Sequence, residues 1–384
     1  MNLPHTADIV IIGGGVMGAS LAWHLASRGT RNVVLLEKEP LFGQGSTGKC
    51  AGGVRYQFGT EINIRLSLAS LPMLERFKDE LGQDVHYRPC GYLFVLTDER
   101  DVQTFQHNVA LQRRLGVQTE WLDGDEVRRR LPMLRFDDAL AGTFHQKDGL
   151  VDPNSVVMGY IGAAQKRGVR TFTATEVTGI RVRGGKVEGV ETSRGVIQTR
   201  TVVNAAGAWA GQIGQMAGVS LPIQPIRRQM FTTTPLAAIP ADFPFVIDFA
   251  QSLYFHREGE GLLIGMSNPH ETPGFNQSVD EAWELTNLEA ALARMPLLER
   301  ARRAAHWAGL YEVTPDAHPI YGKTPVEGFL VCAGFSGHGF MHGPVSGKLM
   351  SELILDGAFS TVDVSMLDLA RFEQGRLIKE YNVV

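Results

Sequence analysis

The sequence predicts an α/β fold in which helices cover a parallel sheet, joined to a second, α+β domain built on a large antiparallel or mixed sheet. Apolar strands run into turns of small residues near positions 13, 206 and 334, and a helix pattern follows each turn. This order is typical of strands that lie parallel in one sheet. The stretch between about residues 222 and 315 is rich in strand patterns and holds one charged helix pattern, which predicts the second sheet.

The first strand ends in a glycine turn that is typical of dinucleotide-binding proteins. Gly13, Gly15 and Gly18 fill the G-x-G-x-x-G positions directly after the apolar run 9–12. The first glycine allows the turn, the second lets backbone N–H groups approach a pyrophosphate, and the third lets the helix pack closely on the strand. The next strand pattern ends in Glu37, where an acidic residue suits the hydroxyls of an adenosine ribose. We therefore expect a Rossmann-like domain that binds a dinucleotide.

The remaining elements follow from periodicity and turn signals. Gly184-Gly185 separates two alternating strand patterns and predicts a two-residue hairpin. Strands are expected at 91–96, 169–172, 177–183, 186–193, 201–209 and at the start of 329–340. Helices are expected at 61–81 with a kink at Pro72, and at 101–115, 123–131, 154–167, 280–294 and 344–356.

The chain is expected to pass between its two domains more than once. Residues 1–85, 147–222 and 316–384 are assigned to the dinucleotide-binding domain, because they contain the three strand-to-turn segments. Residues 86–146 and 223–315 are assigned to a discontinuous substrate domain that covers it. Ligands of such parallel sheets bind beyond the carboxyl ends of the strands, so the site is expected where the two domains meet.

Composition argues against several classes of partner. The 384 residues carry a formal charge of −4, which does not favour nucleic-acid binding, and no apolar run approaches the roughly 20 residues of a membrane span. Cys50, Cys90 and Cys332 are too few and too scattered for a disulfide framework or a zinc site. We expect no metal and a reducing, cytoplasmic environment, and MNLPHTAD at the start lacks the pattern of a secretory signal.

Several motifs carry a resemblance to a known family. They are IIGGGVMGASLAWHL with Glu37, GSTGKCAGGVRYQF at 45–58, GYLFVL at 91–96, VVNAAGAWA at 202–210, WAGLYEVTPDAHPIYG at 307–322 and AGFSGHGFMHGP at 333–344. With them the chain resembles, over nearly its whole length, the D-amino acid oxidase and sarcosine oxidase (DAO) superfamily of FAD-dependent amine oxidoreductases. The resemblance is greatest to the β subunits of L-proline dehydrogenases and sarcosine oxidases.

The resemblance implies FAD as the cofactor and assigns residues to it. Ser46 and Thr47 are expected to cap the first helix and bond the phosphates, and the backbone of Val177 to contact adenine. The turn from Gly334 to Gly339 is expected to line the isoalloxazine ring. The full set of expected cofactor-binding residues is Gly13, Gly15, Gly18, Glu37, Lys38, Ser46, Thr47, Gly53, Val177, Gly334, Gly337 and Gly339. The cysteine that binds flavin covalently in monomeric sarcosine oxidases aligns with Gly309, so the FAD is expected to be non-covalent.

On the substrate side the resemblance points to an arginine anchor. Arg55 matches the family position that binds the substrate carboxylate, and a guanidinium suits this role because its planar fork binds carboxylate bidentately. The alternative is a structural arginine that pairs with Glu61 or a helix end. Tyr254 matches a tyrosine that faces the substrate, with a sheet-surface aromatic as the alternative. His338 is expected either to polarise the substrate or to support the glycine turn.

Two departures from the monomeric sarcosine oxidases concern oxygen. Those enzymes have lysines at the positions of Leu263 and Met341, and a cation near reduced flavin stabilises forming superoxide. Met341 is instead what the resemblance to proline dehydrogenase β subunits implies, so a dehydrogenase is favoured over an oxidase. The resemblance also implies an electron-accepting partner subunit or a quinone, and it leaves room for FMN at an interface with such a subunit.

Together these expectations describe an FAD-dependent oxidoreductase acting on the CH–NH group of a small secondary amino acid, L-proline or sarcosine-like. A hydride passes from carbon to flavin N5 and an imine results. Two alternatives stay open: an oxygen-using sarcosine or D-amino acid oxidase, and a non-catalytic flavoprotein assembly factor that has kept the fold.

Overall fold

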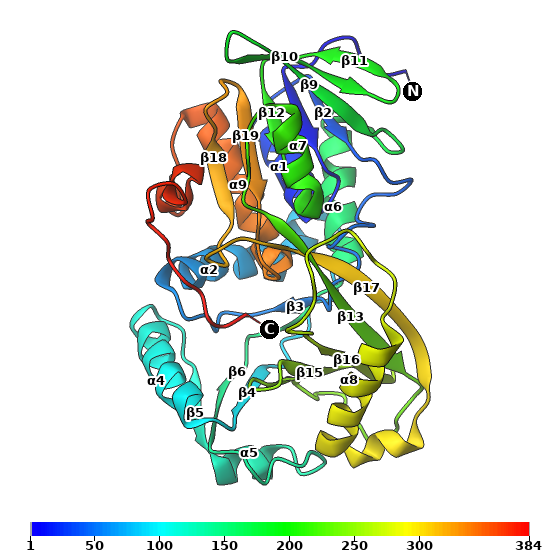
Figure 1. Ribbon diagram of the computed structural model, residues 1–384, viewed down its shortest axis with the longest axis vertical. Helices are drawn as coiled ribbons and strands as arrows, with labels where there is room; N and C mark the ends of the chain where they lie inside the picture. The colour runs from blue at the N-terminus through cyan, green and yellow to red at the C-terminus, as the bar shows by residue number, and fades with distance from the viewer. Residues whose placement is uncertain (1, 384) are drawn as a thin grey trace.

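Six strands form one sheet, and this sheet lies in the upper half of the molecule in Figure 1. The structure, a computed structural model, describes residues 2–383. The strand order is β18-β19-β12-β1-β2-β8, and all neighbours run parallel except β18 and β19. The strands are β1 (Ile9–Ile12), β2 (Val33–Leu36), β8 (Arg170–Phe172), β12 (Val202–Asn204), β18 (Ile320–Lys323) and β19 (Phe329–Ala333).

Both faces of this sheet are covered, which explains the unbroken apolar runs of its strands. Ile9 and Ile11 of β1 pack into one core with helices α1 (Val16–Ser27), α6 (Pro153–Lys166) and α9 (Gly339–Asp356). Val10 and Ile12 point the other way. They pack with α7 (Ala210–Met216) and with the small antiparallel sheet of β9 (Val177–Arg183), β10 (Lys186–Thr192) and β11 (Gly195–Gln198).

The predicted hairpin between β9 and β10 is confirmed. Gly184 and Gly185 have φ values of 57° and 76°. Two successive residues at positive φ are what a tight hairpin turn of this hand requires, and glycine adopts that conformation without steric cost.

A second sheet of eight strands forms the lower half of the molecule, in the order β17-β13-β16-β15-β14-β4-β6-β5. Only β14 and β4 pair in parallel, so the sheet is mixed. The strands are β4 (Tyr92–Leu96), β5 (Glu120–Asp123), β6 (Ala141–His145), β13 (Gln224–Thr233), β14 (Phe245–Asp248), β15 (Leu253–Glu258), β16 (Gly261–Met266) and β17 (Arg303–Val313). One face is covered by α5 (Gly124–Arg130) and α8 (Glu281–Arg294).

The α/β fold class with a large mixed second sheet is therefore confirmed. The parallel sheet takes its strands from residues 9–36, 170–204 and 320–333, and the mixed sheet takes its strands from 92–145 and 224–313. The remaining pieces are α2 (Glu61–Glu75), α3 (Phe77–Leu81), α4 (Glu99–Arg114), β3 (Gly53–Val54) and β7 (Gly149–Leu150). The exact domain boundaries stay a prediction.

Two helix predictions differ from the structure. The helix expected at 61–81 is divided at Arg76 into α2 and α3. The helix expected to start at Pro344 starts at Gly339, so Pro344 lies inside α9.

A serine of α2 bridges two backbone groups of α9 beside Pro344. The Ser70 hydroxyl donates to Met341 O at 2.6 Å and accepts from Val345 N at 3.4 Å, and so stands between two groups that an unbroken helix bonds directly. This contact between residues far apart in sequence explains why the helix start was misjudged.

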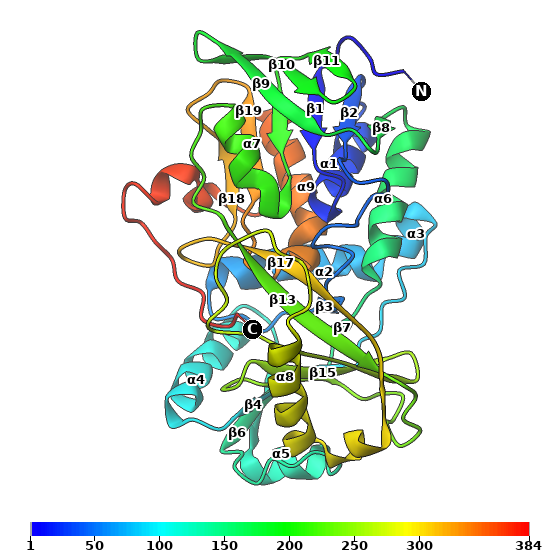
Figure 2. The same cartoon turned by 45° about the vertical axis from the view of Figure 1, so that its right-hand side comes forward.

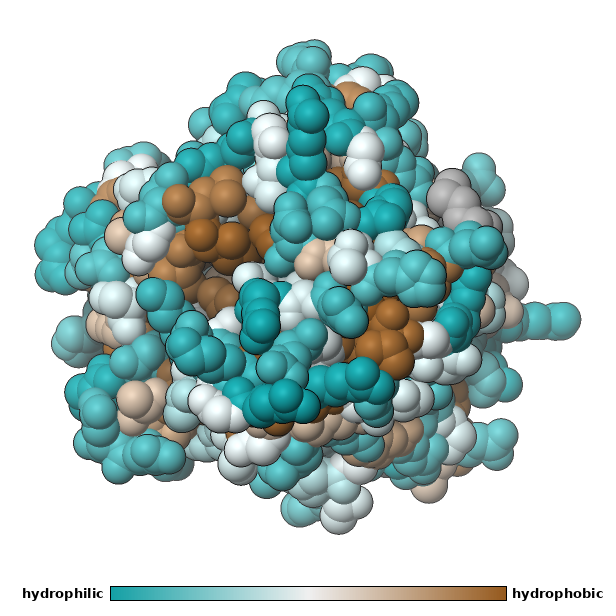
Figure 3. All heavy atoms as spheres, turned by 90° about the horizontal axis from the view of Figure 1, so that it is seen from above, coloured by the Kyte–Doolittle hydropathy of each residue, from teal (hydrophilic) through white to brown (hydrophobic). Residues whose placement is uncertain are grey.

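The surface seen from above in Figure 3 is mainly hydrophilic, with hydrophobic side chains gathered in separate areas, one of them around a hollow. Among residues 2–383 no helix has both the length and the apolar character needed to cross a membrane. Figures 1 and 2 both show the C-terminal part of the chain running from the upper half to the junction of the two halves.

Candidate active site

A long cleft lies between the two sheets, beyond the carboxyl ends of β1, β2 and β12. Its floor comes from the first domain and its opposite wall from the second. The floor is lined by the β1–α1 turn, residues 36–39, 45–55 and 175–177, the segment after β12, and residues 336–341. This is where ligands bind in open α/β sheets, so the topology places a binding site where the sequence predicted one.

The glycine turn fits a dinucleotide because it leaves no room for side chains. A Cβ on Gly13, whose φ is 112°, would lie 2.3 Å from Ala205 O, and a Cβ on Gly18 would lie 2.0 Å from Gly13 O. Gly18 does not line the cleft; it lets α1 approach β1 closely, as predicted. Gly13 and Gly15 line the cleft at the α1 N-terminus, where free amides and the helix dipole favour a phosphate.

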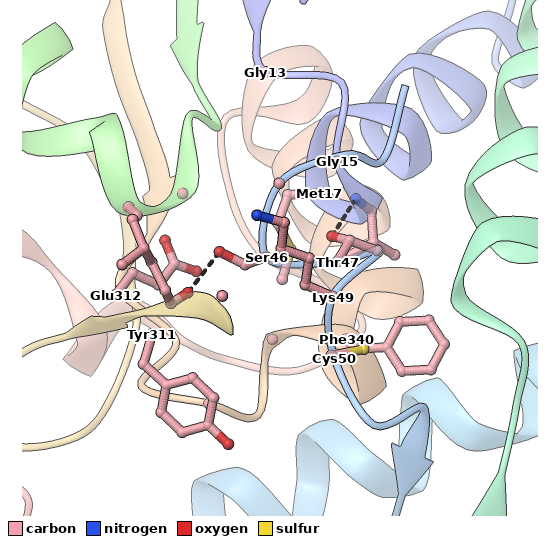
Figure 4. Close-up of a pocket in the computed structure, with 18 of the residues that line it drawn as sticks. Gly13, Gly15, Met17, Ser46, Thr47, Lys49, Cys50, Tyr311, Glu312 and Phe340 are labelled. Carbon is pink, nitrogen blue, oxygen red and sulfur yellow. Dashed lines mark hydrogen bonds between the residues drawn. The ribbon is translucent and has the colours of Figure 1, made fainter. Parts of the chain in front are cut away.

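Ser46 and Thr47 are neighbours in sequence but form hydrogen bonds with different parts of the structure. Thr47 Oγ1 accepts a hydrogen bond of 3.2 Å from Val16 N, the first amide of α1. The Ser46 hydroxyl instead donates to Leu310 O at 2.6 Å, so the prediction that Ser46 caps the helix is wrong. Both residues line the cleft, and Figure 4 shows both hydrogen bonds beside the turn of Gly13 and Gly15.

Glu37 lies where a ribose is expected. Its Oε2 accepts from Gly14 N at 2.7 Å and its Oε1 accepts from Glu39 N at 2.8 Å, which leaves lone pairs on both oxygens for hydroxyl donors. Burial raises the pKa of the Glu37 carboxyl, and these two amides oppose the shift. Val177 lines the cleft nearby, and Lys38 places its ammonium 3.5 Å from the centre of the Trp209 ring.

The third glycine turn closes the floor of the cleft. Gly337, with φ at 101°, lies against Tyr311, and a Cβ there would come 2.4 Å from the Tyr311 ring. Gly337 and Gly339 line the cleft, as does Gly53. Gly334 was predicted to line it but is not among its lining residues; a Cβ there would meet the Thr314 side chain at 2.6 Å. Gly334 therefore serves packing behind the turn.

Arg55 brings a buried positive charge to the cleft. Its side chain is 6% exposed, and its guanidinium lies 4.0 Å from the centre of the Phe58 ring. It donates to the carbonyl oxygens of Gln57 and Asn382. Burial lowers the pKa of the guanidinium. None of the ion pairs among residues 2–383 includes Arg55.

The ion pair of Arg55 with Glu61, one form of the structural alternative, is not formed. Glu61 forms its ion pair with Arg65, at 2.7 Å. Three guanidinium N–H groups of Arg55 are left beyond the two carbonyl contacts, since arginine carries five such donors. Glu380 and Asp148 act on this guanidinium electrostatically without forming an ion pair with it. A buried cation without a direct ion pair is costly, and here it faces a binding cleft.

The loop that carries Arg55 is fixed by a buried carboxylate. Asp148 accepts from Tyr56 N at 2.8 Å, from Gln57 Nε2 at 2.9 Å and from His145 Nδ1 at 2.8 Å. These bonds hold the residues directly after Arg55, so the guanidinium is presented by a rigid loop.

The wall above Arg55 is aromatic. Tyr92 stacks on Phe245 with ring centres 4.2 Å apart, and Phe245 stacks on Tyr254 at 5.5 Å. Tyr254 is 8% exposed and lines the cleft, so it is not a sheet-surface aromatic. It covers Gly265, where a Cβ would come 2.2 Å from the ring. Such a wall excludes water from the space beneath it.

His338 and Met341 line the floor of the cleft at the start of α9. His338 precedes the first residue of α9, and its Nε2 has no hydrogen-bond partner among the described residues. Burial, together with the nearby His342 and Arg55, lowers the pKa of His338 well below its usual value, so its imidazole is neutral at pH 7. Met341 is 6% exposed, and no cation stands at its position.

Among the cleft residues that were not predicted from the sequence are Arg228, Tyr311 and Glu312. Figure 4 shows the side chains of Tyr311 and Glu312 leaving β17 on opposite sides. Burial raises the pKa of Glu312 to about 7, and its Oε2 has no hydrogen-bond partner among residues 2–383. The alternation of side chains along the strand could have indicated Arg228, because Arg228 and Met230 lie two residues apart and therefore share one face.

Comparisons with known proteins agree with this geometry. Residues 8–353 match the family model described as FAD dependent oxidoreductase, DAO. FAD-dependent oxidoreductase domain-containing protein 1 of Xenopus laevis is 31% identical, with 99% of this chain and 85% of that protein covered. Mitochondrial dimethylglycine dehydrogenase of Rattus norvegicus is 32% identical over 91% of this chain, but this chain covers only 43% of that protein.

Among solved structures, L-proline dehydrogenase from P. horikoshii superposes with a TM-score of 0.90. It is 33% identical, and the match covers 98% of this chain and all of that one. The fold, the cleft and the family match agree: this chain belongs to the DAO family and is an FAD-dependent oxidoreductase.

Proposed function

We propose that the protein oxidises a small secondary amino acid, L-proline or sarcosine-like, at its CH–NH group. One observation carries the proposal: Arg55 presents a buried guanidinium without an ion-pair partner among residues 2–383 to the cleft, beneath an aromatic wall. A substrate carboxylate supplies the missing anion and gains charge-assisted hydrogen bonds. Similarity to proteins named L-proline dehydrogenase and dimethylglycine dehydrogenase supports the same substrate class.

The chain's own residues bind and orient the substrate. Arg55 fixes the carboxylate, which places the adjacent carbon over the floor formed by His338 to Met341. When bound there, FAD supplies the ring that accepts a hydride from that carbon. The aromatic wall excludes water, and the neutral His338 adds no positive charge that would repel the iminium cation left when the neutral amine loses a hydride. Amides at the start of α9 stabilise negative charge on the floor.

The residues of the floor also fit non-covalent FAD. Gly309 stands at the position of the covalent cysteine in monomeric sarcosine oxidases, and a Cβ there would lie 3.1 Å from Lys49 Cβ. The unpartnered His338 Nε2 and Glu312 Oε2 are buried polar atoms that a polar ligand in the cleft satisfies. FMN at an interface with a partner subunit is a further proposal from the family resemblance.

We favour a dehydrogenase that passes electrons to a partner subunit or a quinone. Leu263 is 3% exposed among apolar neighbours, and Met341 lines the cleft, so neither position offers a cation to oxygen. One observation favours the second candidate, an oxygen-using oxidase: Arg228 and Lys49 are cations that line the same cleft. The three cysteines are free thiols, which supports a reducing, cytoplasmic location.

Anaerobic mixing of the yellow protein with L-proline, sarcosine and D-alanine tests the proposal. Rapid bleaching of the visible flavin band by L-proline or sarcosine, with slow recovery in air and little peroxide, is the expected result. Fast recovery with stoichiometric peroxide would establish the oxidase. Preference for D-alanine would move the substrate to D-amino acids. A flavin that no amine reduces would favour the non-catalytic assembly factor.

A further inference from the structure

Two adjacent arginines on β13 have opposite surroundings. Arg227 is fully paired: its Nε lies 3.0 Å from Glu271 Oε2, and its Nη2 lies 3.4 Å from Asp280 Oδ2. It also donates to Ser278 O at 2.8 Å. Because successive side chains of a strand point to opposite faces, Arg228 faces the other way, into the cleft, with Met230.

Arg228 lacks such partners. Its Nη1 donates to the neighbouring backbone carbonyl of Arg227 at 3.0 Å, and its guanidinium lies 5.2 Å from the centre of the Tyr311 ring. Its Nε is buried and has no hydrogen-bond partner among residues 2–383. No acidic side chain of the described chain forms an ion pair with it, whereas the arginine beside it has two. Glu271, the ion-pair partner of Arg227, acts on Arg228 electrostatically but does not pair with it. Burying a guanidinium without a direct ion pair is unfavourable, which leaves Arg228 suited to bind an anion in the cleft.

Acidic and basic side chains both line the cleft, with Lys38 beside Glu37 and Glu39, and Lys49 on the loop before Arg55. Glu37, Glu39 and Glu176 line the end expected to hold the adenosine. Glu312 turns toward Gly207 on the floor, where a Cβ of Gly207 would lie 3.6 Å from its Oε2. The aromatic wall contributes Arg228, and the loop facing it contributes Arg55. Both guanidinium groups line the same cleft as Tyr311, and both act electrostatically on its hydroxyl.

We propose that Arg228 binds a second acidic group of the substrate, so that the enzyme prefers secondary amino acids with two carboxylates, one held by Arg55 and one by Arg228. This inference rests on the proposed function, because it assigns the substrate class of the same site. The hydroxyls of Tyr254 and Tyr311 act electrostatically on Arg228, and they provide further hydrogen-bond donors for the second carboxylate.

Matched pairs of substrates test the inference. Iminodiacetate is sarcosine with one added carboxylate, and N-methyl-L-aspartate is N-methyl-L-alanine with one added carboxylate. Anaerobic flavin reduction gives kcat/KM for each member of a pair. We expect the diacid of at least one pair to be favoured about 10- to 100-fold, as hydrogen bonds to a charged group provide. Arg228→Met should lower this diacid-to-monoacid ratio by about the same factor, and Arg228→Lys should keep most of it.

The control is Arg303→Met, which removes an exposed arginine from the neighbouring strand β17 and its pair with Glu284. Its ratio should equal that of the wild type. Monoacids preferred in both pairs, or a ratio that Arg228→Met leaves unchanged, would overturn the inference. Flavin content and melting temperature confirm that each variant is folded.

A binding measurement separates this inference from the proposed function. Thiodiacetate and methylthioacetate carry sulfur in place of the amine, so they bind without forming an imine, and the flavin spectrum reports binding. Tighter binding of thiodiacetate that depends on Arg228 supports the inference even if no amine reduces the flavin. Equal binding of both sulfur acids, combined with reduction by sarcosine, would reject the role of Arg228 and leave the proposed function standing.

Discussion

The floor and the wall of the cleft are built in different ways. The floor is backbone: the turn at Gly13, the start of α1 and the start of α9 present amides, and Glu37 provides the expected ribose contact. The wall is side chain: Tyr92, Phe245 and Tyr254 come from three strands of a mixed sheet and touch only because those strands pair. The floor therefore has little freedom to vary, whereas the wall can change its ligand by changing single residues.

The largest effect is expected on the floor, from Gly13→Ala. The new methyl group would lie 2.3 Å from Ala205 O at a φ of 112°, so the turn must move and FAD binding should be lost. The measurement is bound flavin per chain after purification. Gly29→Ala is the matched control, because Gly29 also has positive φ but no neighbour within 4 Å of its Cβ; it should retain flavin. Full flavin content in Gly13→Ala would contradict the rigid floor.

Arg55→Ala should have the next largest effect and should act on substrate alone. Losing a bidentate carboxylate contact of roughly 3–4 kcal/mol raises KM about 100- to 1000-fold while FAD stays bound. Steady-state kinetics with the best amine and the flavin spectrum measure the two parts. Arg65→Ala, which removes an exposed arginine paired with Glu61, should change neither. Unchanged KM in Arg55→Ala would remove Arg55 from carboxylate binding.

Met341→Lys tests the effect of a cation on the floor of the cleft. A cation at this cleft-lining position should speed reoxidation of the reduced flavin by oxygen, by about 10-fold or more, because it stabilises forming superoxide. Stopped-flow mixing of reduced protein with aerated buffer measures the rate, and Met341→Leu is the neutral control. Met341 suits this test better than Leu263, which is packed in an apolar cluster where a lysine would itself be costly. An unaltered rate would undo the argument from the missing lysine.

Glu312 should give the smallest effect, on stability. Burial raises its pKa to about 7 from an ordinary 4.5, so the folded state binds a proton more tightly than the unfolded state does. Its contribution is fully present below pH 4.5 and is lost as the pH rises through about 7. Across this window the wild-type protein should lose on the order of 1–2 kcal/mol of unfolding free energy, allowing for partial exposure of Glu312 to the cleft. Glu312→Gln should not show this loss. Parallel pH profiles for both proteins in urea unfolding would contradict this.

The sequence predicted the floor far better than the wall, for a physical reason. A backbone turn depends on residues that are close in sequence, so Gly13, Gly15 and Glu37, which lie within 30 residues, predict its geometry. Even in the floor, contacts between residues far apart in sequence were not predicted: Ser46 bonds Leu310, and Ser70 bonds the backbone of α9 beside Pro344. The wall depends on strand order and register, in which β4 joins β14 across about 150 residues. Arg228 was not predicted because neither the strand order nor the register follows from the residues around it.

Under the proposed function, this cleft oxidises an amine whose carboxylate is held by Arg55. The most direct test of this function compares anaerobic flavin reduction by L-proline and sarcosine with reduction by pyrrolidine and dimethylamine, the same amines without the carboxylate. We expect the acids to bleach the flavin and the simple amines to do so at least about 100-fold more slowly at equal concentration. Equally fast bleaching by the simple amines, or none by either set, would contradict it.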